Sequence, residues 1–283
     1  LSNLDGNNGF RLDGGMPIDF SGTSVSNAGD VNGDGFDDVI VGASQPNGSY
    51  SGSSYVVFGQ ASGFSAAMDL SSLNGSNGFR LDGEAAYDIL GSSVSNAGDV
   101  NGDGFDDLIV GAYGTGSNGG YSGFNYVVFG KASGFSAAMD LSTLNGSNGF
   151  RLDGANGDYS GTSASTAGDI NGDGLDDLIV GAKGANPNND GSGSSYVVFG
   201  KASGFSATMN LSSLNGSNGF RLNGVAGDFS GFSVSNAGDV NGDGFDDLII
   251  GALGADGGSG SSYVVFGKAS GFSAEMDLSS LDG

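Results

Sequence analysis

Side chains that could bind a hard cation recur at a fixed spacing in this chain. The nine residues from Asp30 to Asp38 read Asp-Val-Asn-Gly-Asp-Gly-Phe-Asp-Asp, with side-chain oxygens at positions 1, 3, 5 and 9. Close copies start at Asp99, Asp169 and Asp239. Calcium binds oxygen ligands in flexible geometry, and the glycines at positions 4 and 6 let a chain turn sharply around an ion. The spacing therefore predicts four calcium loops.

Two other interpretations of these loops fit less well. Asn-Gly and Asp-Gly also form ordinary hairpin turns, but a turn does not need three carboxylates and an amide at ligand spacing. A helix-loop-helix calcium loop needs an acidic ligand at position 12. That position is apolar in every copy, where the residues are Val41, Val110, Val180 and Ile250.

The loops belong to a longer repeat, which we divide as 1–69, 70–140, 141–210 and 211–277, with a stub at 278–283. We treat residues 1–283 as a single domain. In the first repeat we expect strands near Phe10–Asp13, Thr23–Gly29, Asp38–Ala43 and Ser53–Gly59, because apolar runs alternate there with Gly, Asn, Asp and Ser clusters. A short turn capped by Asp69 follows. Four short strands at a long period predict an all-β chain of propeller blades rather than a solenoid of parallel coils.

Composition excludes several classes of function. The chain has 32 acidic and 8 basic residues, a formal charge of −24, and neither His nor Cys. Zinc, haem and thiol chemistry lack their usual ligands, and no basic patch is available for nucleic acid. Glycine accounts for 58 residues, yet the 37% of hydrophobic residues form short runs typical of a folded protein.

The sequence also bears on location. No run approaches the roughly 20 apolar residues of a membrane-spanning helix. No signal peptide is visible and residue 1 is Leu, so we expect a mature product or a segment of a longer protein.

Several elements together resemble a known family. The Phe20-Ser-Gly and Phe229-Ser-Gly elements, the acidic loops and Val41-Gly-Ala43 are similar to the FG-GAP repeat of integrin α subunits and bacterial surface proteins. The resemblance covers essentially the whole chain, four times over. It implies a calcium-binding, extracellular β-propeller, although integrin propellers have more blades than the four repeats present here.

Ligand chemistry and this resemblance together assign the metal ligands. In the first site they are the side chains of Asp30, Asn32, Asp34 and Asp38 and the carbonyl of Phe36. We expect Asp37 and its equivalents at position 8 to point outward or to support these ligands from behind. Four Ca²⁺ ions, one per repeat, would hold the hairpins together. The equivalent ligands are Asp99, Asn101, Asp103, Phe105 and Asp107; Asp169, Asn171, Asp173, Leu175 and Asp177; and Asp239, Asn241, Asp243, Phe245 and Asp247.

The resemblance also suggests how the fold could close. It implies that the Ser-rich strand is innermost and that the strand near Phe10–Asp13 is outermost in the preceding blade. Residues 9–13 would then complete the blade that ends with Tyr263–Gly267 and close a four-bladed ring. A fragment of a larger ring and an assembly across chains remain as alternatives.

The acidic and basic residues do not form an evident candidate for a catalytic site. Most of them recur at matching repeat positions, whereas a catalytic site usually needs one singular constellation. The recurring arginines Arg11, Arg80, Arg151 and Arg221 are expected to tie strands or blades together. We therefore predict that the protein is not an enzyme.

Sequence variation is concentrated in two loops of each repeat, at 14–20 and 44–52 in the first copy. Both should lie on the rim opposite the acidic loops, where a rigid scaffold commonly presents recognition residues. The prediction is a non-enzymatic adhesion or binding module with a protein or glycan ligand at this rim. A lectin, or a structural subunit of a surface layer or filament that assembles with itself, remains an alternative. The variable loops carry Tyr50, Tyr87, Tyr113, Tyr121, Tyr159, Lys183, Asp190 and Asp256.

Overall fold

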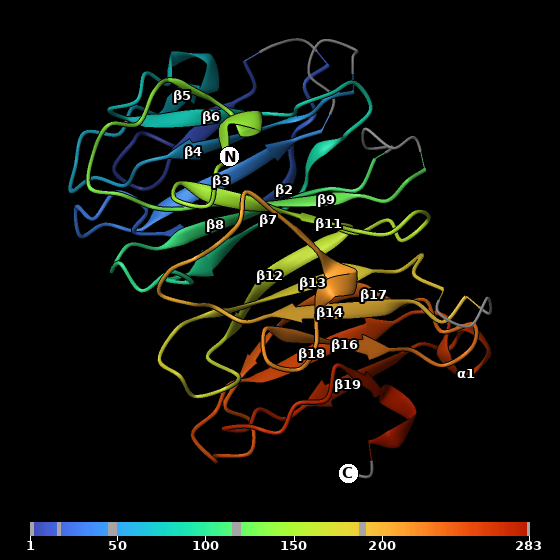
Figure 1. Ribbon diagram of the computed structural model, residues 1–283. Coiled ribbons are helices and arrows are strands. Elements are labelled where there is room, and N and C mark those ends of the chain that lie inside the picture. The colour runs from blue at the N-terminus through green and yellow to red at the C-terminus, as the bar shows by residue number, and fades with distance from the viewer. Residues whose placement is uncertain (1–2, 16–17, 45–49, 115–119, 187–190, 282–283) are drawn as a thin grey trace.

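The computed structural model describes residues 3–15, 18–44, 50–114, 120–186 and 191–281. Within these ranges the chain forms β-sheets that follow one another in sequence order, from the N-terminal sheet at the top of Figure 1 to the C-terminal sheet at the bottom. The predicted all-β class is therefore confirmed.

Each repeat contributes the same three consecutive antiparallel strands, as the repeated sequence requires. The inner strands are β2 (Ser21–Gly29), β7 (Leu90–Gly98), β12 (Ser163–Gly168) and β17 (Ser230–Gly238). The second strands are β3 (Asp38–Ala43), β8 (Asp107–Ala112), β13 (Asp177–Ala182) and β18 (Asp247–Ala252). The third strands are β4 (Ser53–Val57), β9 (Phe124–Val128), β14 (Ser194–Val198) and β19 (Ser261–Val265).

The outer strand of each sheet comes from the following repeat. The strands β6 (Gly78–Asp82), β11 (Gly149–Asp153) and β16 (Gly219–Asn223) pair antiparallel with β4, β9 and β14. We call each resulting sheet a blade and number the blades 1 to 4 along the chain. Blades 1 to 3 have this outer strand, whereas blade 4 contains β17, β18 and β19 alone. The predicted order of strands within a blade is thus observed.

Short parallel strands that the sequence did not predict extend blades 1 to 3, and one more forms a separate two-stranded sheet with β1. The three-residue strands β5 (Ala67–Asp69), β10 (Ala138–Asp140), β15 (Thr208–Asn210) and β20 (Glu275–Asp277) pair with β1 (Arg11–Asp13), β6, β11 and β16 respectively. Each is followed by one 3-10 turn, at Leu70–Ser72, Leu141–Thr143, Leu211–Ser213 and Leu278–Ser280. Asp69 caps the first turn by accepting a hydrogen bond from Ser71 N at 2.8 Å, as expected. The helix α1 (Ala255–Gly258) is four residues long.

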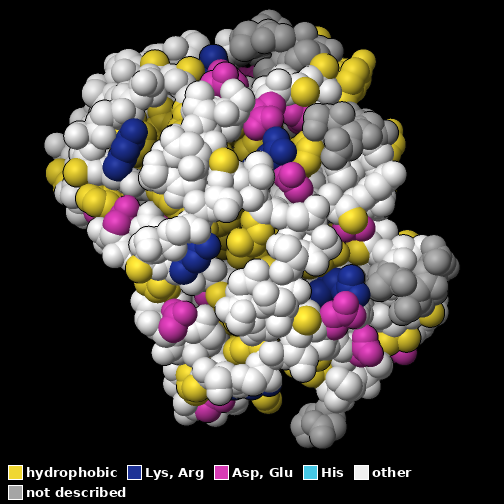
Figure 2. Space-filling view, viewed as in Figure 1, with side chains coloured by type: hydrophobic (Ala, Val, Ile, Leu, Met, Phe, Trp, Pro, Cys, Tyr) yellow, Lys and Arg dark blue, Asp and Glu magenta, His cyan; other side chains and the backbone are white. Residues whose placement is uncertain are grey.

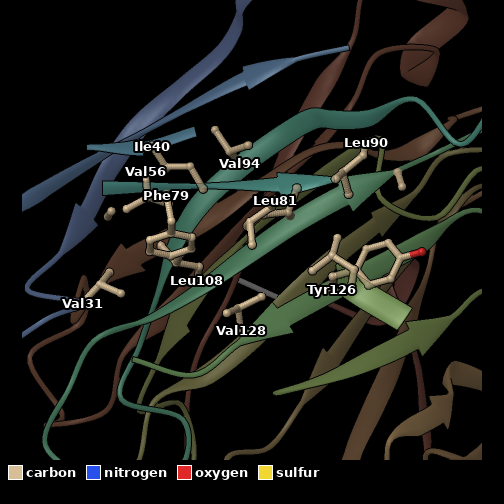
Figure 3. Close-up of a cluster of buried hydrophobic side chains, with 14 of the residues drawn as sticks. Val31, Ile40, Val56, Phe79, Leu81, Leu90, Val94, Leu108, Tyr126 and Val128 are labelled. Carbon is tan, nitrogen blue, oxygen red and sulfur yellow. The ribbon is translucent and has the colours of Figure 1, made fainter. Parts of the chain in front are cut away.

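The hydrophobic core lies mainly between successive blades. The inner strands pack side by side, β2 on β7, β7 on β12 and β12 on β17. Figure 3 shows one such layer, in which Ile40 and Val56 of blade 1 lie in one cluster with Val94 and Leu108 of blade 2. The buried members of this cluster are at most 8% exposed and come from both blades, so each blade depends on the next for burial.

The expected closure by the N-terminal strand is not confirmed. Strand β1 pairs with β5, and β19 is the outermost strand of blade 4. The reason is the order of stacking, because in the described residues the inner strand of each blade packs on that of its neighbour in sequence. Blades 1 and 4 therefore occupy opposite ends of the stack (Figure 1). The described arrangement is an open series of four blades, which is compatible with a β-propeller.

Two surface features complete the description. The described part of the chain contains no helix with the length and apolar character needed to cross a membrane. On the face shown in Figure 2, the described Lys and Arg side chains are separated from one another, and hydrophobic side chains lie in the grooves between other residues.

Candidate functional site

The acidic loops join the inner and second strands of each blade and are organised by their own carboxylates. In the first loop, Asp30 accepts hydrogen bonds from the backbone N–H groups of Asp34 and Gly35 at 3.0 and 2.8 Å. Asn32 Oδ1 also accepts from Asp34 N at 2.8 Å. Gly33 and Gly35 have φ values of 70° and 87°, which only glycine adopts without strain.

This hydrogen-bonding pattern is the same in all four loops. The carboxylate at position 1 accepts from the N–H of position 5, and the carboxylate at position 5 accepts from the N–H of position 7. The loops therefore have one conformation built four times, as their shared sequence predicts. The position 1 to position 5 distances are 3.0 Å at Asp99, 3.0 Å at Asp169 and 3.1 Å at Asp239.

The carboxylate at position 9 lies beneath the loop as the first residue of the second strand. Asp38 is 1% exposed, and Asp107, Asp177 and Asp247 are fully buried. Asp38 accepts one hydrogen bond from Val31 N at 3.1 Å and another from Gly59 N at 2.7 Å. A buried carboxylate thus joins the loop to the end of the third strand in each blade.

Burial makes these carboxylates costly to ionise. Burial is the main cause that raises the pKa of Asp38 to about 7, and repulsion by the nearby carboxylates of Asp34 and Asp30 contributes to the same rise. Burial likewise raises the pKa of Asp107 and of Asp177 to about 8. A cation placed among these groups would favour their charged forms.

The predicted ligands fit a hard cation in their chemistry, and several already lie within hydrogen-bonding distance. The amide nitrogen of Asn171 contacts both carboxylate oxygens of Asp177 at 3.3 and 3.2 Å. In the first loop, Asn32 Nδ2 lies 3.1 Å from Asp34 Oδ2. Among the described residues, however, no three acidic side chains converge as a ready-formed metal centre. The carboxylates instead accept backbone N–H groups, and the metal assignment stays a prediction.

The acidic residue at position 8 has a role that we did not predict in detail. Asp106 Oδ2 accepts a hydrogen bond from Asp30 N of the preceding blade at 2.8 Å. Asp176 and Asp246 bind Asp99 N and Asp169 N in the same way, both at 2.9 Å. These side chains tie one acidic loop to the next, because each reaches the first residue of the preceding loop. Asp37 in blade 1 is exposed.

The recurring arginines act mainly within their own strands. Arg11, Arg80 and Arg151 each pair with the aspartate two residues later, at distances of 2.6 to 2.7 Å. In the fourth copy the second residue is Asn223, and Arg221 binds Glu275 at 2.9 Å. Arg151 also reaches Glu84 at 3.0 Å. The ion pairs of Arg151 with Glu84 and of Arg221 with Glu275 join separate segments, as predicted, whereas those of Arg11 and Arg80 lie within one strand and do not tie strands together.

Two stacked tyrosine pairs lie on the rim opposite the acidic loops, with Tyr159 half-buried and the other three tyrosines exposed. Antiparallel strands place the two variable loops of a repeat at the same end of the sheet. Tyr50 stacks on Tyr87 with ring centroids 5.8 Å apart, and Tyr121 stacks on Tyr159 at 5.1 Å. All four residues have φ between 52° and 68°. Backbone strain of this kind is common at functional positions.

The remaining candidates on this rim are more scattered. Lys183 lies over the Phe232 ring with its Nζ 5.0 Å from the centroid. Asp256 is exposed in α1, and Tyr113 is half-buried. Asp190 lies outside the described residues.

A hollow of about 570 Å³ opens between the two variable loops of the third repeat. Its lining includes Asn156, Asp158, Tyr196 and Arg221. The Tyr196 hydroxyl donates to Asp158 Oδ2 at 3.2 Å, and burial raises the pKa of that carboxyl. This polar hollow could take a small polar group of a ligand.

Sequence reasoning did not single out the buried acid of this hollow. Each blade has an equivalent, namely Asp19, Asp88, Asp158 or Asp228, and all are at most 7% exposed. Their recurrence was visible in the sequence, but their burial was not, because it depends on loops that contact the preceding sheet. Only the tertiary structure shows that a tyrosine hydroxyl lies beside Asp19, Asp158 and Asp228.

Comparison with known proteins adds independent support for the repeat. The FG-GAP repeat family model matches residues 21–57, 90–128, 160–198 and 230–265, which together form more than half of the chain. Each match contains the three consecutive strands and the acidic loop of one blade. Integrin alpha-4 of Xenopus laevis is 30% identical over 92 residues, covering 32% of this chain and 8% of that protein. On the strength of its four matching segments, the chain belongs to the FG-GAP repeat family.

Proposed function

We propose that this chain is an extracellular, calcium-stabilised binding module of the adhesion class, which recognises a protein or glycan through its variable-loop rim and catalyses no reaction. The observation that carries the proposal is the difference between its two rims. One rim repeats the same acidic loop four times, whereas the other presents divergent loops with exposed aromatic residues and a polar hollow.

The acidic rim suits a structural role. Its ligands would be the predicted carboxylates, amides and carbonyls of each loop, and the ion would supply the positive charge that joins loop and strand. Extracellular calcium modules often bind with dissociation constants of about 10⁻⁴ to 10⁻³ M. Sites with such dissociation constants are occupied at the calcium concentrations found outside cells, and folding then depends on calcium.

The opposite rim suits recognition. Tyr121 is 48% exposed and Tyr159 is half-buried, and the two rings stack on each other. Because stacking already restricts both side chains, they would lose little conformational entropy on binding a ligand. Beside them, Asn156 and Arg221 offer hydrogen-bonding groups in the hollow. A rigid aromatic platform next to polar groups is a common feature of binding surfaces.

A lectin is the second candidate, and the same stacked tyrosines favour it because aromatic faces pack on sugar rings. The two candidates differ in the ligand rather than in the site. The FG-GAP repeat and the similarity to integrin alpha-4 support the adhesion class.

The test is binding of the whole chain to a panel of extracellular matrix proteins and to a glycan array, with calcium and with a chelator. We expect a ligand whose binding falls at least about tenfold in the double variant Tyr121→Ala/Tyr159→Ala. The control is Ser203→Ala, an exposed residue near the acidic loops. Binding that survives the rim change but not the control would contradict the proposed rim site.

A further inference from the structure

The arginine on the outer strand of blade 3 lacks the partner that its equivalents have. In the other copies the arginine Nε binds the aspartate two residues later, whereas Arg221 is followed at that distance by Asn223. The Asn223 side chain is already engaged, because it accepts from Ser194 Oγ and donates to Asp277 Oδ1, both at 3.2 Å. Arg221 Nε is buried and has no hydrogen-bond acceptor among the described residues. Buried donors without an acceptor are rare in folded proteins, so this guanidinium is incompletely satisfied.

The same arginine lines the hollow of about 570 Å³ on the variable rim. We call this space the blade 3 hollow. Its lining residues lie between Ala155 and Arg221, and blade 3 has all five of its strands, β12, β13, β14, β16 and β20. The hollow is therefore not an unfinished end of the stack of blades.

Blade 2 shows a carboxylate beside the corresponding arginine. Arg151 and Arg221 are equivalent, since each pairs across the strands with a tyrosine, Tyr126 or Tyr196. Arg151 Nη1 donates to Glu84 Oε2 at 3.0 Å, although the two residues are 67 positions apart. The Glu84 side chain is only 24% exposed in this contact. The chain itself thus supplies an acidic side chain to the guanidinium of blade 2.

The loop that leads into blade 3 has no counterpart of this glutamate. In the loop into blade 2, Glu84 precedes Ala85, whose N–H donates to the buried Asp88 Oδ2 at 2.8 Å. Ala155 makes the same bond to Asp158 Oδ2 at 3.0 Å, but the residue before it is the glycine of the preceding turn. The second loop is thus one residue shorter, and the residue that it lacks is the glutamate.

Arg221 consequently binds one carboxylate fewer than Arg151 does. Arg151 pairs with two carboxylates, whereas Arg221 pairs only with Glu275, at 2.9 Å, and that glutamate is 61% exposed. A buried aspartate lies near the guanidinium in both blades. Its negative charge does not exclude another carboxylate, because blade 2 holds both. One more carboxylate would give Arg221 the same set of charges that surrounds Arg151.

We propose that the blade 3 hollow binds the carboxylate of a glutamate or aspartate side chain on a protein ligand, with Arg221 as its main partner. This inference rests on the proposed function, because it assigns a ligand chemistry to the variable-loop rim. The ligand carboxylate takes the place beside Arg221 that Glu84 takes beside Arg151. In blade 2 the glutamate of the chain is an internal occupant that keeps a ligand out.

The charge of the whole chain favours a protein over an acidic polysaccharide. A formal charge of −24 repels a uniformly acidic polymer, but it tolerates one acidic side chain within a neutral or basic segment. The stacked tyrosines lie next to the hollow, since Gly157 N of its lining donates to Gly120 O and Tyr159 N donates to Tyr121 O, both at 2.9 Å. The same segment could therefore place an apolar residue on the tyrosine pair.

The test uses two peptides, acetyl-Gly-Lys-Glu-Lys-Gly-amide and the same peptide with glutamine in place of glutamate. The chain has four arginines, so with isotopically labelled arginine their Nε–H signals can be followed individually by NMR in calcium-containing buffer. We expect the glutamate peptide to shift the Arg221 signal and to bind at least about tenfold more tightly than the glutamine peptide. Non-specific attraction predicts the opposite order, because the glutamine peptide carries more positive charge.

Three variants locate the site. Arg221→Gln should abolish the preference for the glutamate peptide, whereas Arg80→Gln, at the same strand position in blade 1, should retain it. Glu84→Ala should open a second site, so that two peptides bind per chain and the Arg151 signal also shifts. This gain of binding does not depend on how well the fold tolerates replacement of Arg221.

An insertion tests the occupant directly. A glutamate inserted between Gly154 and Ala155 restores the loop length of blade 2 and should weaken binding of the glutamate peptide at least about tenfold. An inserted alanine is the matched control and should weaken it less. Circular dichroism spectra that match the unchanged chain would show that these variants are folded.

Several outcomes would overturn the inference. They are equal or tighter binding of the glutamine peptide, and glutamate-peptide binding that is unchanged in Arg221→Gln. Tighter binding of methyl glucuronide than of the peptide, with the same dependence on Arg221, would assign the hollow to an acidic glycan instead. If a matrix protein binds through Tyr121 and Tyr159 but its binding is the same in Arg221→Gln, the inference fails while the proposed function stands.

Discussion

The carboxylate of Asp106 accepts a hydrogen bond from the backbone N–H of Asp30 at 2.8 Å, across the boundary between blades 1 and 2. The reverse bond, from Asp106 N to Asp30 O, measures 3.4 Å. Asp30 begins one acidic loop and Asp106 nearly ends the next one. The contact therefore links the order of one loop to the position of the neighbouring blade.

This contact leads to the first prediction. Asp106→Ala should lower the free energy of unfolding by about 1–2 kcal/mol, because it removes a charge-assisted hydrogen bond to a backbone N–H. Asp37→Ala is a matched control, since Asp37 holds the same loop position but is exposed at the free end of blade 1. Both are measured by urea unfolding at a concentration where the chain is monomeric. Equal effects of the two variants would contradict a role between blades.

Calcium removal tests the acidic loops. We expect four bound ions per chain by calorimetric titration, and a marked fall in Tm when a chelator is added. At calcium concentrations a hundredfold above Kd, each site would add about 2.7 kcal/mol of stability. An unchanged melting curve in the chelator would rule out a structural role for the ions.

A variant in one loop tests calcium binding at that loop alone. Asp103→Asn should reduce the number of ions from four to three, because it removes a carboxylate from the second loop only. The neutral Ser203→Ala change should leave four. A stoichiometry that is unaffected by Asp103→Asn would show that this loop does not bind the ion.

Close packing of the inner strands gives a third prediction. Gly42→Ala should destabilise the fold by about 1–3 kcal/mol, because the new methyl group would meet the Gly91 carbonyl oxygen, which lies 2.0 Å from the ideal Cβ position. Gly251→Ala is the matched control in blade 4, where only the mobile Ser233 hydroxyl must move. Thermal unfolding of the two variants at equal concentration compares them. A larger loss for Gly251→Ala would contradict the described packing of the blades.

The sequence predicted those parts of the fold that local pattern determines. Asp38–Ala43 was placed correctly because an apolar run follows the acidic loop directly, and the outer-strand exchange followed from the family resemblance. The strand Ala67–Asp69 was missed, because three residues carry no alternating pattern and its parallel partner is distant in sequence.

In the candidate site, too, the sequence predicted the contacts between near neighbours and missed the distant ones. Spacing alone located the loop residues such as Asp30 and Asp34, since those contacts are between neighbours in sequence. It could not locate the partner of Asp106, which is 76 residues away, or the tyrosine hydroxyl that donates to Asp158, which is 38 residues away. Contacts between residues so far apart in sequence depend on how strands and blades pack. The sequence of one repeat does not specify where the neighbouring repeat lies.

The buried acid of the rim hollow gives the last prediction, a dependence on pH. Burial raises the pKa of Asp158 above its ordinary value of 3.8, so the folded state binds this proton more tightly than the unfolded state does. The ionised carboxylate therefore costs stability at pH 7, and that cost is relieved as the pH falls from the raised pKa towards 3.8. Nearby Tyr196 and Arg221 favour the charged form and only reduce this effect.

Asp158→Asn should consequently be more favourable, relative to the unchanged chain, at pH 7 than at pH 4. The asparagine oxygen can still accept the bonds from Ala155 N and the Tyr196 hydroxyl, so little else need change. Urea unfolding of both chains at the two pH values, at fixed calcium, measures the difference and cancels any common effect of the loops. Asp256→Asn, at an exposed position on the same rim, should show no such dependence. If Asp158→Asn had the same effect at both pH values, the carboxyl would be titrating like one in water, and the described burial of Asp158 would be wrong.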